Sequence, residues 1–302
     1  MTESAPAAGG AAPRFESAAS VLSGLRRVGY LADDLIASVV WLADRLGKPV
    51  LVEGPAGTGK TQLAKSVAEL AGAPLIRLQC YEGLDEAKAL YEWNYRKQLL
   101  RVQAGHEDGG ASWAELESDI FSEEFLLARP LLQAIRAAEP VVLLVDEVDR
   151  IEIETEALLL ELLSDYQVSI PELGTIRAAS VPLVFLTSNG TRELSEALKR
   201  RCLFLHLSYP SLARERDIIT ARLPGISAQL AGQVAGVVTM LRSLDLKKHP
   251  SISETIDWAR TLMLLGVTAI TPQEVTATLH VLLKHQSDIE QAASDLATAP
   301  AP

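Results

Sequence analysis

The chain has 302 residues, 48% of them hydrophobic, and a formal net charge of −11 at pH 7. This length predicts one large domain with a smaller companion, and the acidic balance disfavours broad, sequence-independent contact with nucleic acid or a membrane surface. Two cysteines, Cys80 and Cys202, have neither the number nor the spacing of a zinc site or disulfide framework. No run reaches the roughly 18 apolar residues of a membrane span, so we expect a cytoplasmic protein without membrane insertion.

The first third of the chain changes its hydrophobic period twice. Residues 1–18 lack the charged start and long apolar core of a secretory signal, and we expect a flexible leader. Apolar residues then recur at helical spacing up to Gly47, a plausible helix stop. "PVLVEG" (49–54) predicts a strand buried in a parallel sheet, and "TQLAKSVAELAG" (61–72) predicts a helix.

The alternation of strands and helices continues through the middle of the chain. Strands are expected within 74–80, 140–147 and 181–189, and helices within 130–138 and 156–166. Such interleaving predicts an α/β layer with a parallel sheet and helices on both faces. The polar stretch at residues 82–126 exceeds the needs of a crossover, so we expect an insertion there.

The last third loses its strand signals. We expect a large ATP-binding domain at residues 19–209 and a small all-helical lid domain at 210–286. Residues 287–302 lose the apolar stripe and end in Ala and Pro, which predicts a flexible tail.

A complete G-x-x-x-x-G-K-[ST] pattern lies between the first expected strand and its helix. Glycines let backbone N–H groups turn toward a phosphate, Lys60 reaches the outer phosphates, and the Thr61 hydroxyl can ligate Mg²⁺. The sequence therefore predicts a site for ATP and Mg²⁺. The expected nucleotide-contacting residues of this stretch are Gly54, Pro55, Ala56, Gly57, Thr58, Gly59, Lys60, Thr61 and Gln62.

Two later strands end in residues that suit phosphate chemistry. Asp146 and Glu147 follow "VVLLV", where one carboxylate can hold Mg²⁺ and the next can polarise an attacking water. Asn189 follows the next strand, where its side chain could hydrogen-bond the γ-phosphate or that water. Arg200 and Arg201 could stabilise transition-state charge or serve as surface charges, and their spacing does not decide between the two.

With these elements in order, "GPAGTGKT", "VVLLVDE", "LTSN" and "ALKRRC", the chain resembles an AAA+ ATPase. Longer segments resemble the MoxR-type branch associated with carbon monoxide dehydrogenase maturation. They are "RLQCYEGLDEAKALYEWNY", "LLSDYQVSIPELGTIRA", "ALKRRC" and "SISETIDWAR".

The resemblance implies a homo-oligomeric ring, usually a hexamer, with ATP between neighbouring subunits. Asp146 would organise Mg²⁺, Glu147 would activate water, and Asn189 would act as the first sensor. An arginine would act on the neighbour's ATP, and we favour Arg201 over Arg200. The resemblance further implies a partner with a von Willebrand factor A domain and a metalloenzyme client such as molybdenum-containing carbon monoxide dehydrogenase.

Other positions carry less specific expectations. Many relatives have a second-sensor arginine at the start of a lid helix, whereas here the first arginine of "SISETIDWAR" is Arg260, almost two helical turns later. Tyr30 and Leu31 lie where the family often contacts adenine, although they also suit a helical core. Candidate contact elements of the ring are the insert within residues 89–100 and a hairpin at "IPELGTI".

Two other functions share parts of this pattern. A small-molecule kinase has the same phosphate loop but needs neither a ring nor an arginine from a neighbour. A DNA-acting ATPase of the clamp-loader type has a similar arginine motif, but it requires a basic track that the acidic balance disfavours.

Overall fold

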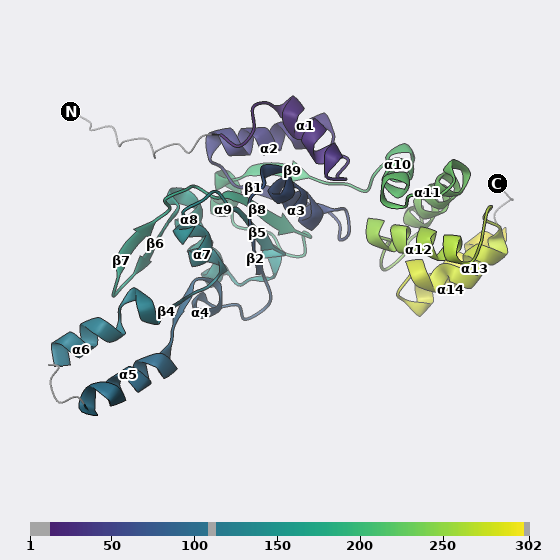
Figure 1. Cartoon of the computed structure of the whole chain (residues 1–302). Coiled ribbons are helices and arrows are strands. Elements are labelled where there is room, and N and C mark those ends of the chain that lie inside the picture. The colour runs from purple at the N-terminus through teal and green to yellow at the C-terminus, as the bar shows by residue number, and fades with distance from the viewer. Residues whose placement is uncertain (1–12, 108–112, 299–302) are drawn as a thin grey trace. The chain divides into compact units, whose positions relative to one another are not determined.

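The computed structural model describes residues 13–107 and 113–298, which divide into two compact units. The first unit comprises the chain up to Glu53 together with Thr61–His206, and the second comprises Gly54–Lys60 together with the chain from Leu207 onward. Figure 1 shows the sheet and helices of the first unit and the helices of the second. Among the described residues, no helix combines the length and the apolar character needed to cross a bilayer.

A parallel five-stranded sheet forms the centre of the first unit, in the order β2-β5-β8-β1-β9. Its inner strands β5 and β8 are apolar and buried along their whole length, as expected for a parallel sheet that is covered on its faces. The predicted α/β layer with a parallel sheet is confirmed. The strands are β1 Val50–Glu53, β2 Leu75–Gln79, β5 Val142–Asp146, β8 Leu183–Ser188 and β9 Leu203–His206.

Helices flank this sheet, with α2 packed against β1 and β9, and α7 against β2 and β5 (Figure 1). The helical spacing of residues 15–46 belongs to two helices, because the chain turns at Gly29 (φ 76°) and restarts at the N-cap Asp33, which accepts from the Ile36 N–H. Gly47 ends α2 in the left-handed conformation. The helices are α1 Ala18–Arg27, α2 Asp34–Leu46, α3 Lys60–Ala71, α7 Pro130–Arg136, η2 Val148–Arg150, α8 Ile153–Asp165 and α9 Glu196–Arg201.

The predicted leader, residues 1–18, is held in place over its described part. Residues 1–12 lie outside the described residues. Arg14 forms an ion pair with Asp44 at 2.9 Å and donates to the Val181 carbonyl, while Phe15 is buried. An ion pair and a core contact therefore link residues 14 and 15 to the rest of the first unit, and the flexibility of the leader stays a prediction.

Two short antiparallel hairpins accompany the main sheet. The insertion pairs β3 with β4, and Trp93 on β3 contacts Phe121 edge to face. A second hairpin, β6 Gln167–Ile170 with β7 Gly174–Arg177, confirms the hairpin expected at "IPELGTI". The insertion consists of α4 Glu86–Ala89, β3 Tyr91–Trp93, α5 Tyr95–Glu107, α6 Trp113–Ile120, η1 Glu123–Phe125 and β4 Leu126–Ala128.

The second unit is helical around its own core, in which Trp258 is fully buried and donates to Thr278 Oγ1 at 2.7 Å. The tail expected to be flexible, 287–302, is described as far as residue 298, and that part belongs to α14. Ala292 packs into the core, and buried Asp288 accepts the Lys247 and Lys248 N–H groups. The helices are α10 Leu212–Arg222, α11 Ala228–Ser243, α12 Ile252–Leu264, α13 Pro272–Leu282 and α14 Gln286–Thr298.

A buried ion pair joins three of these helices. Arg242 on α11 donates from both terminal nitrogens to the Glu215 carboxylate of α10, at 2.6 and 2.9 Å. Glu215 also accepts from the Thr255 hydroxyl of α12, and Arg242 Nε donates to the Pro250 carbonyl. The Arg242 guanidinium lies 4.4 Å from the ring centre of Tyr209. This network fixes the start of α12 against the two preceding helices.

Candidate nucleotide-binding site

The loop Gly54–Lys60 has the tight backbone that its glycines predict. Gly57 and Gly59 adopt φ of 77° and 94°, a region that side chains with a Cβ rarely occupy. Lys60 is buried, and its Nζ donates to the Gly54 and Pro55 carbonyls at 2.7 and 2.8 Å. The Thr58 hydroxyl closes the same turn on the Pro55 carbonyl. The loop therefore presents a compact turn with an ammonium group inside it.

The start of α12 touches this loop within the second unit. The Ile252 N–H donates to the Gly57 carbonyl at 3.1 Å, and a Cβ added to Gly57 would lie 2.1 Å from the Ser251 Cβ. Ser251 is the N-cap of α12 and forms a capping box with Glu254. Glycine is required at position 57 because the helix start approaches the loop so closely.

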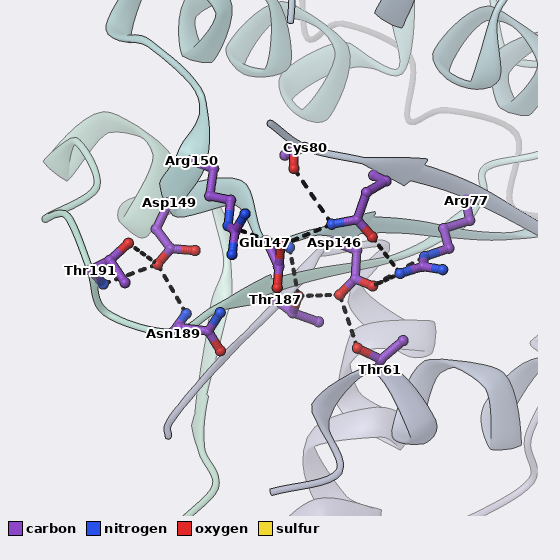
Figure 2. Close-up of polar contacts among 11 residues, drawn as sticks. Thr61, Arg77, Cys80, Asp146, Glu147, Asp149, Arg150, Thr187, Asn189 and Thr191 are labelled. Atoms are coloured by element: carbon purple, nitrogen blue, oxygen red, sulfur yellow. Dashed lines mark hydrogen bonds and ion pairs between the residues drawn. The ribbon is translucent and has the colours of Figure 1, made fainter. Parts of the chain in front are cut away.

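In the first unit, a short hydrogen-bonded chain joins α3, β5 and β8 (Figure 2). Asp146 Oδ1 accepts from the Thr61 hydroxyl at 3.0 Å and from the Thr187 hydroxyl at 2.6 Å. The Thr187 oxygen in turn accepts from the Glu147 N–H at 2.9 Å. Thr61 follows Lys60 directly in the chain, so the phosphate loop leads into the helix that delivers the Thr61 hydroxyl to Asp146. The Asp146 and Thr187 side chains meet because neighbouring parallel strands end at one edge of the sheet.

The other carboxylate oxygen of Asp146 is held by Arg77 of β2. Asp146 Oδ2 accepts from Arg77 Nε at 3.1 Å and from one terminal nitrogen at 2.5 Å (Figure 2). Arg77 also donates to the side-chain oxygen of Gln79, which lies two residues further along the same strand. Alternate residues of a strand share a face, so the pattern "R-L-Q" aligns both polar side chains. The sequence analysis did not identify Arg77 or Gln79, although two polar residues alternating near a strand's carboxyl end were an available signal.

Glu147 occupies an unusual backbone position immediately after β5. Its φ of 58° and ψ of 50° place a residue with a Cβ in the left-handed region, which the contact from its N–H to Thr187 helps to hold. Its carboxylate oxygen Oε2 accepts from Gln79 and pairs with Arg150, each at 3.0 Å. The side chain is 30% exposed. The orientation of the Glu147 side chain is thus set by its backbone conformation and by its contacts with Gln79 and Arg150.

Asp149 organises the loop after β8, in which Asn189 lies. Asp149 Oδ2 accepts from the Asn189 N–H at 3.2 Å, from the Thr191 N–H at 3.0 Å and from the Thr191 hydroxyl at 2.6 Å (Figure 2). Burial alone would raise the pKa of Asp149, but the hydrogen bonds from Thr191 and Asn189 outweigh it and lower the pKa below its ordinary value. Asp149 therefore stays ionised and holds the backbone of Asn189 in place.

Glu156 of α8 holds the next part of the same loop. Its buried carboxylate accepts from the Ser195 N–H and pairs with Arg192, each at 2.9 Å. Burial raises the pKa of this carboxyl, yet hydrogen bonds from Ser195 and Arg192 lower it overall. Neither Asp149 nor Glu156 was identified from the sequence, because acidic residues next to a helix start are ordinarily solvated.

The two arginines at the end of α9 differ in their surroundings. Arg201 is half-buried, and it donates to the Ser164 hydroxyl at 2.5 Å and to the Ala197 carbonyl at 2.8 Å. Arg200 is exposed, and within residues 13–107 and 113–298 its side chain has no recorded hydrogen bond or ion pair. The arginine favoured from the sequence is thus the one already engaged by its own chain.

Four further predicted site residues have the following positions. Tyr30 and Leu31 lie half-buried between α1 and α2, and Gln62 on α3 donates to Ser66. Arg260 pairs with Asp257 at 3.4 Å on an exposed face of α12. It lies eight residues beyond Ile252, so about 12 Å of helix separates it from the contact with Gly57. The roles of all four residues at the nucleotide stay predictions.

The donor set of the site suits Mg²⁺ better than a metal held wholly by protein. Thr61 and Asp146 supply a hydroxyl and a carboxylate, which Mg²⁺ commonly combines with phosphate oxygens and water. Across the described part of the chain, no group of three or more His, Cys, Asp or Glu residues could hold a metal ion. Burial, with the nearby charges of Asp146, Asp149 and Glu147, raises the pKa of the Cys80 thiol to about 12 and keeps it from being a thiolate ligand.

Comparison with known proteins places this site within a family model. Residues 49–202, half of the chain, match the model described as an AAA domain of the dynein-related subfamily. Two proteins of Staphylococcus aureus, from strains bovine RF122 / ET3-1 and USA300, are each 28% identical over 171 residues, and both are described as uncharacterized. The match covers 54% of this chain and 57% of each relative, so the chain spans only about half the length of these relatives.

Solved structures of similar fold include those of Thermotoga maritima RuvB. One, described as a Holliday junction branch migration motor, is 17% identical with a TM-score of 0.46, over 86% of this chain and 69% of that one. A point mutant of the same protein is 18% identical with a TM-score of 0.48, over 88% and 68% of the two chains. The family match, together with the parallel sheet and the helical second unit, confirms the predicted fold class.

Proposed function

The chain belongs to the dynein-related subfamily of AAA domains, and we propose that it hydrolyses Mg²⁺-ATP to remodel another protein. The observation that carries the proposal is the hydrogen-bonded chain Thr61–Asp146–Thr187–Glu147, which begins one residue after the phosphate-loop lysine. The proposed metal ligands, the Thr61 hydroxyl and the Asp146 carboxylate, are hydrogen-bonded to each other. Thr187 then links Asp146 to Glu147, the proposed base. A glycine turn without these partners would bind phosphate but would have no means of activating water.

The loop and its lysine bind the nucleotide in this proposal. Backbone N–H groups of residues 56–60 would face the phosphates, and the Lys60 ammonium would leave the Gly54 and Pro55 carbonyls to bind the outer phosphates. Thr61 and Asp146 would hold Mg²⁺, which would supply positive charge to offset that of the phosphates. The nucleotide is thus bound by the phosphate loop, the Thr61 hydroxyl and the Asp146 carboxylate at the sheet edge.

Glu147 is the proposed base for hydrolysis. Its carboxylate accepts a proton from the attacking water, and its backbone position is maintained by the N–H contact to Thr187. Asn189 is the proposed first sensor, and Asp149 is its positioning residue through the 3.2 Å contact to the Asn189 N–H. The site would thereby join base and sensor through two neighbouring strands.

The proposal also includes a ring of identical subunits, in which an arginine of one subunit acts on its neighbour. Either Arg200 or Arg201 acts on the ATP of a neighbouring subunit and stabilises transition-state charge. The exposure of Arg200 favours it, whereas Arg201 would first have to leave Ser164 and Ala197. The order of preference from the sequence is therefore reversed in this proposal.

The finer assignment rests on the sequence segments that resemble MoxR-type ATPases. On that basis the partner is a protein with a von Willebrand factor A domain, and the client is a metalloenzyme such as molybdenum-containing carbon monoxide dehydrogenase. Affinity purification from native lysate with a Glu147→Gln trap tests both, since a slowly hydrolysing subunit retains its partners. Recovery of neither class of protein in the ATP-bound trap would contradict this finer assignment.

Two substitutions test hydrolysis directly. Lys60→Ala is expected to lose nucleotide affinity. Glu147→Gln is expected to bind ATP but to hydrolyse it at least about a hundredfold more slowly than wild type. Equal turnover by wild type and Glu147→Gln would show that Glu147 is not the base. Glu139→Gln, which alters an exposed side chain between α7 and β5, is the control for expression and handling.

Dilution and mixing test the ring. An interface ATPase loses specific activity on dilution, whereas a small-molecule kinase keeps it and requires an acceptor. Mixing Arg200→Ala with Glu147→Gln subunits should recover part of the activity, because some interfaces then pair an intact arginine with an intact base. Recovery with Arg201→Ala in place of Arg200→Ala would assign the role to Arg201, and no recovery in rings shown to mix would contradict the arrangement.

A further inference from the structure

The side chain of Asp146 accepts hydrogen bonds through both of its carboxylate oxygens. Oδ1 accepts the two threonine hydroxyls, and Oδ2 accepts Arg77 through two nitrogens. The hydroxyls are neutral donors and leave the charge of the carboxylate in place. The guanidinium is a full positive charge on the carboxylate that the proposed Mg²⁺ would also approach.

We propose that Arg77 competes with Mg²⁺ for Asp146 and thereby sets the Mg²⁺ concentration that nucleotide binding requires. The inference rests on the proposed function, in which Asp146 and Thr61 hold the metal. Two cations that bind the same carboxylate weaken one another's binding, by the reciprocity of linked equilibria. Mg²⁺ then binds with the cost of displacing or repelling Arg77.

The position of Arg77 allows such an exchange. Its side chain is 45% exposed, against 3% for Asp146, so the guanidinium can move into water when another cation takes its place beside the buried carboxylate. Arg77 lies on β2, which is an edge strand of the main sheet and pairs only with β5 among the described strands. Gln79, which accepts from Arg77, provides a second polar contact close by.

The same geometry separates this role from two others. Arg77 is not proposed as a phosphate ligand, because its hydrogen bonds are to Asp146 and Gln79. Nor is it bonded to Glu147, which is approached instead by Gln79 and Arg150. Its effect is therefore expected in metal dependence, and not in phosphate affinity measured without metal.

The test uses the full chain, a fluorescent ADP analogue and a titration with MgCl₂. Arg77→Gln should lower the Mg²⁺ concentration for half-maximal ADP binding by about three- to tenfold, as expected for loss of a partly exposed ion pair. In EDTA, its ADP affinity should stay within about twofold of wild type. Arg77→Lys should fall between the two proteins, because it keeps the charge but loses the two-nitrogen contact.

A matched control separates Arg77 from its neighbour on the strand. Gln79→Leu removes the contacts of Gln79 to Glu147 and to Arg77 but keeps both bonds from Arg77 to Asp146, so its Mg²⁺ requirement should equal that of wild type. A change in Gln79→Leu as large as that in Arg77→Gln would show that the effect passes through Gln79 and would overturn the inference.

Three further outcomes would overturn it, and they have different meanings. An unchanged Mg²⁺ requirement in folded Arg77→Gln would contradict the competition alone. A fall in its ADP affinity in EDTA would make Arg77 a phosphate ligand. Equal ADP binding by wild type with and without Mg²⁺ would remove the metal role of Asp146, whereas the phosphate loop is tested separately by Lys60→Ala in EDTA.

Discussion

Two arginine–carboxylate pairs, Arg77–Asp146 in the first unit and Arg242–Glu215 in the second, are each joined through two guanidinium nitrogens, and they differ in their exposure to water. In the first unit the side chains of Arg77 and Asp146 are 45% and 3% exposed, and in the second those of Arg242 and Glu215 are 8% and 0% exposed. Arg77 has water on one side, while Arg242 is enclosed by Glu215, the Pro250 carbonyl and the Tyr209 ring. The comparison teaches that the same chemistry can be exchangeable at a site and permanent in a core.

The largest expected effect comes from breaking the buried pair. Arg242→Met should lower the free energy of unfolding by about 3–5 kcal/mol, because Glu215 is left charged and buried without its partner. Urea denaturation followed by circular dichroism measures it. The double variant Arg242→Met, Glu215→Leu should regain part of the loss, since both charges are removed. A loss as small as that of an exposed pair would contradict the structural role of Arg242.

The close approach of α12 to the phosphate loop offers a second test of fixed contacts in the second unit. Gly57→Ala would add a Cβ 2.1 Å from the Ser251 Cβ at a φ of 77°. Strain and displacement should cost about 2 kcal/mol or more and should weaken nucleotide binding. Gly225→Ala, with φ of 95° and open space around its Cβ position, is the control for backbone strain alone. Equal nucleotide affinity in both variants would contradict a role for the Ser251 contact.

Asp149 lies between the two extremes, since it is buried but held by neutral donors. Asp149→Asn should cost about 1–3 kcal/mol at pH 7, because an ionised acceptor of three hydrogen bonds is lost. The pKa of Asp149 is lowered in the folded state, so its stabilisation is complete above the ordinary pKa of 3.8 and is lost as the pH falls through the lowered value. The difference between wild type and variant in unfolding free energy should therefore shrink under acid. A difference that grows on acidification would contradict this sign.

The smallest expected effect on stability is that of the exposed pair. Arg77→Met should lower the free energy of unfolding by only about 1 kcal/mol, because Arg77 is partly exposed and the buried Asp146 carboxylate keeps the hydroxyl donors of Thr61 and Thr187. The same urea experiment measures it beside Arg242→Met. A loss comparable to that of Arg242→Met would break the comparison, because it would make Arg77 a structural residue.

Much of the first unit follows from local sequence. "PVLVEG", "PVVLLVDE" and "VPLVFLTSN" predict β1, β5 and β8, because buried parallel strands are continuous apolar runs and their ends carry polar residues. Gly47 ends α2 as expected, since a left-handed residue there favours glycine. The insertion and the β6–β7 hairpin were also expected at their places in the chain.

Contacts between distant residues at the two ends of the described chain were not expected from the sequence. The leader is anchored by Asp44, thirty positions from Arg14. The tail forms α14, because Asp288 accepts backbone N–H groups forty positions away and Ala292 fills a gap in the core. A weak apolar stripe looks like a fraying end when its partners are not known.

The sequence alone determined the phosphate loop, the order of strands and helices, and the positions of Asp146, Glu147 and Asn189 at strand ends, because these depend on residues close together in the chain. Only the tertiary structure decided that Thr187 links Asp146 to Glu147, that Arg77 lies on the remaining oxygen of Asp146, and that Ser251 makes glycine necessary at position 57. The physical reason is that strand pairing and helix packing choose which distant polar groups meet, whereas local pattern chooses only which groups are available.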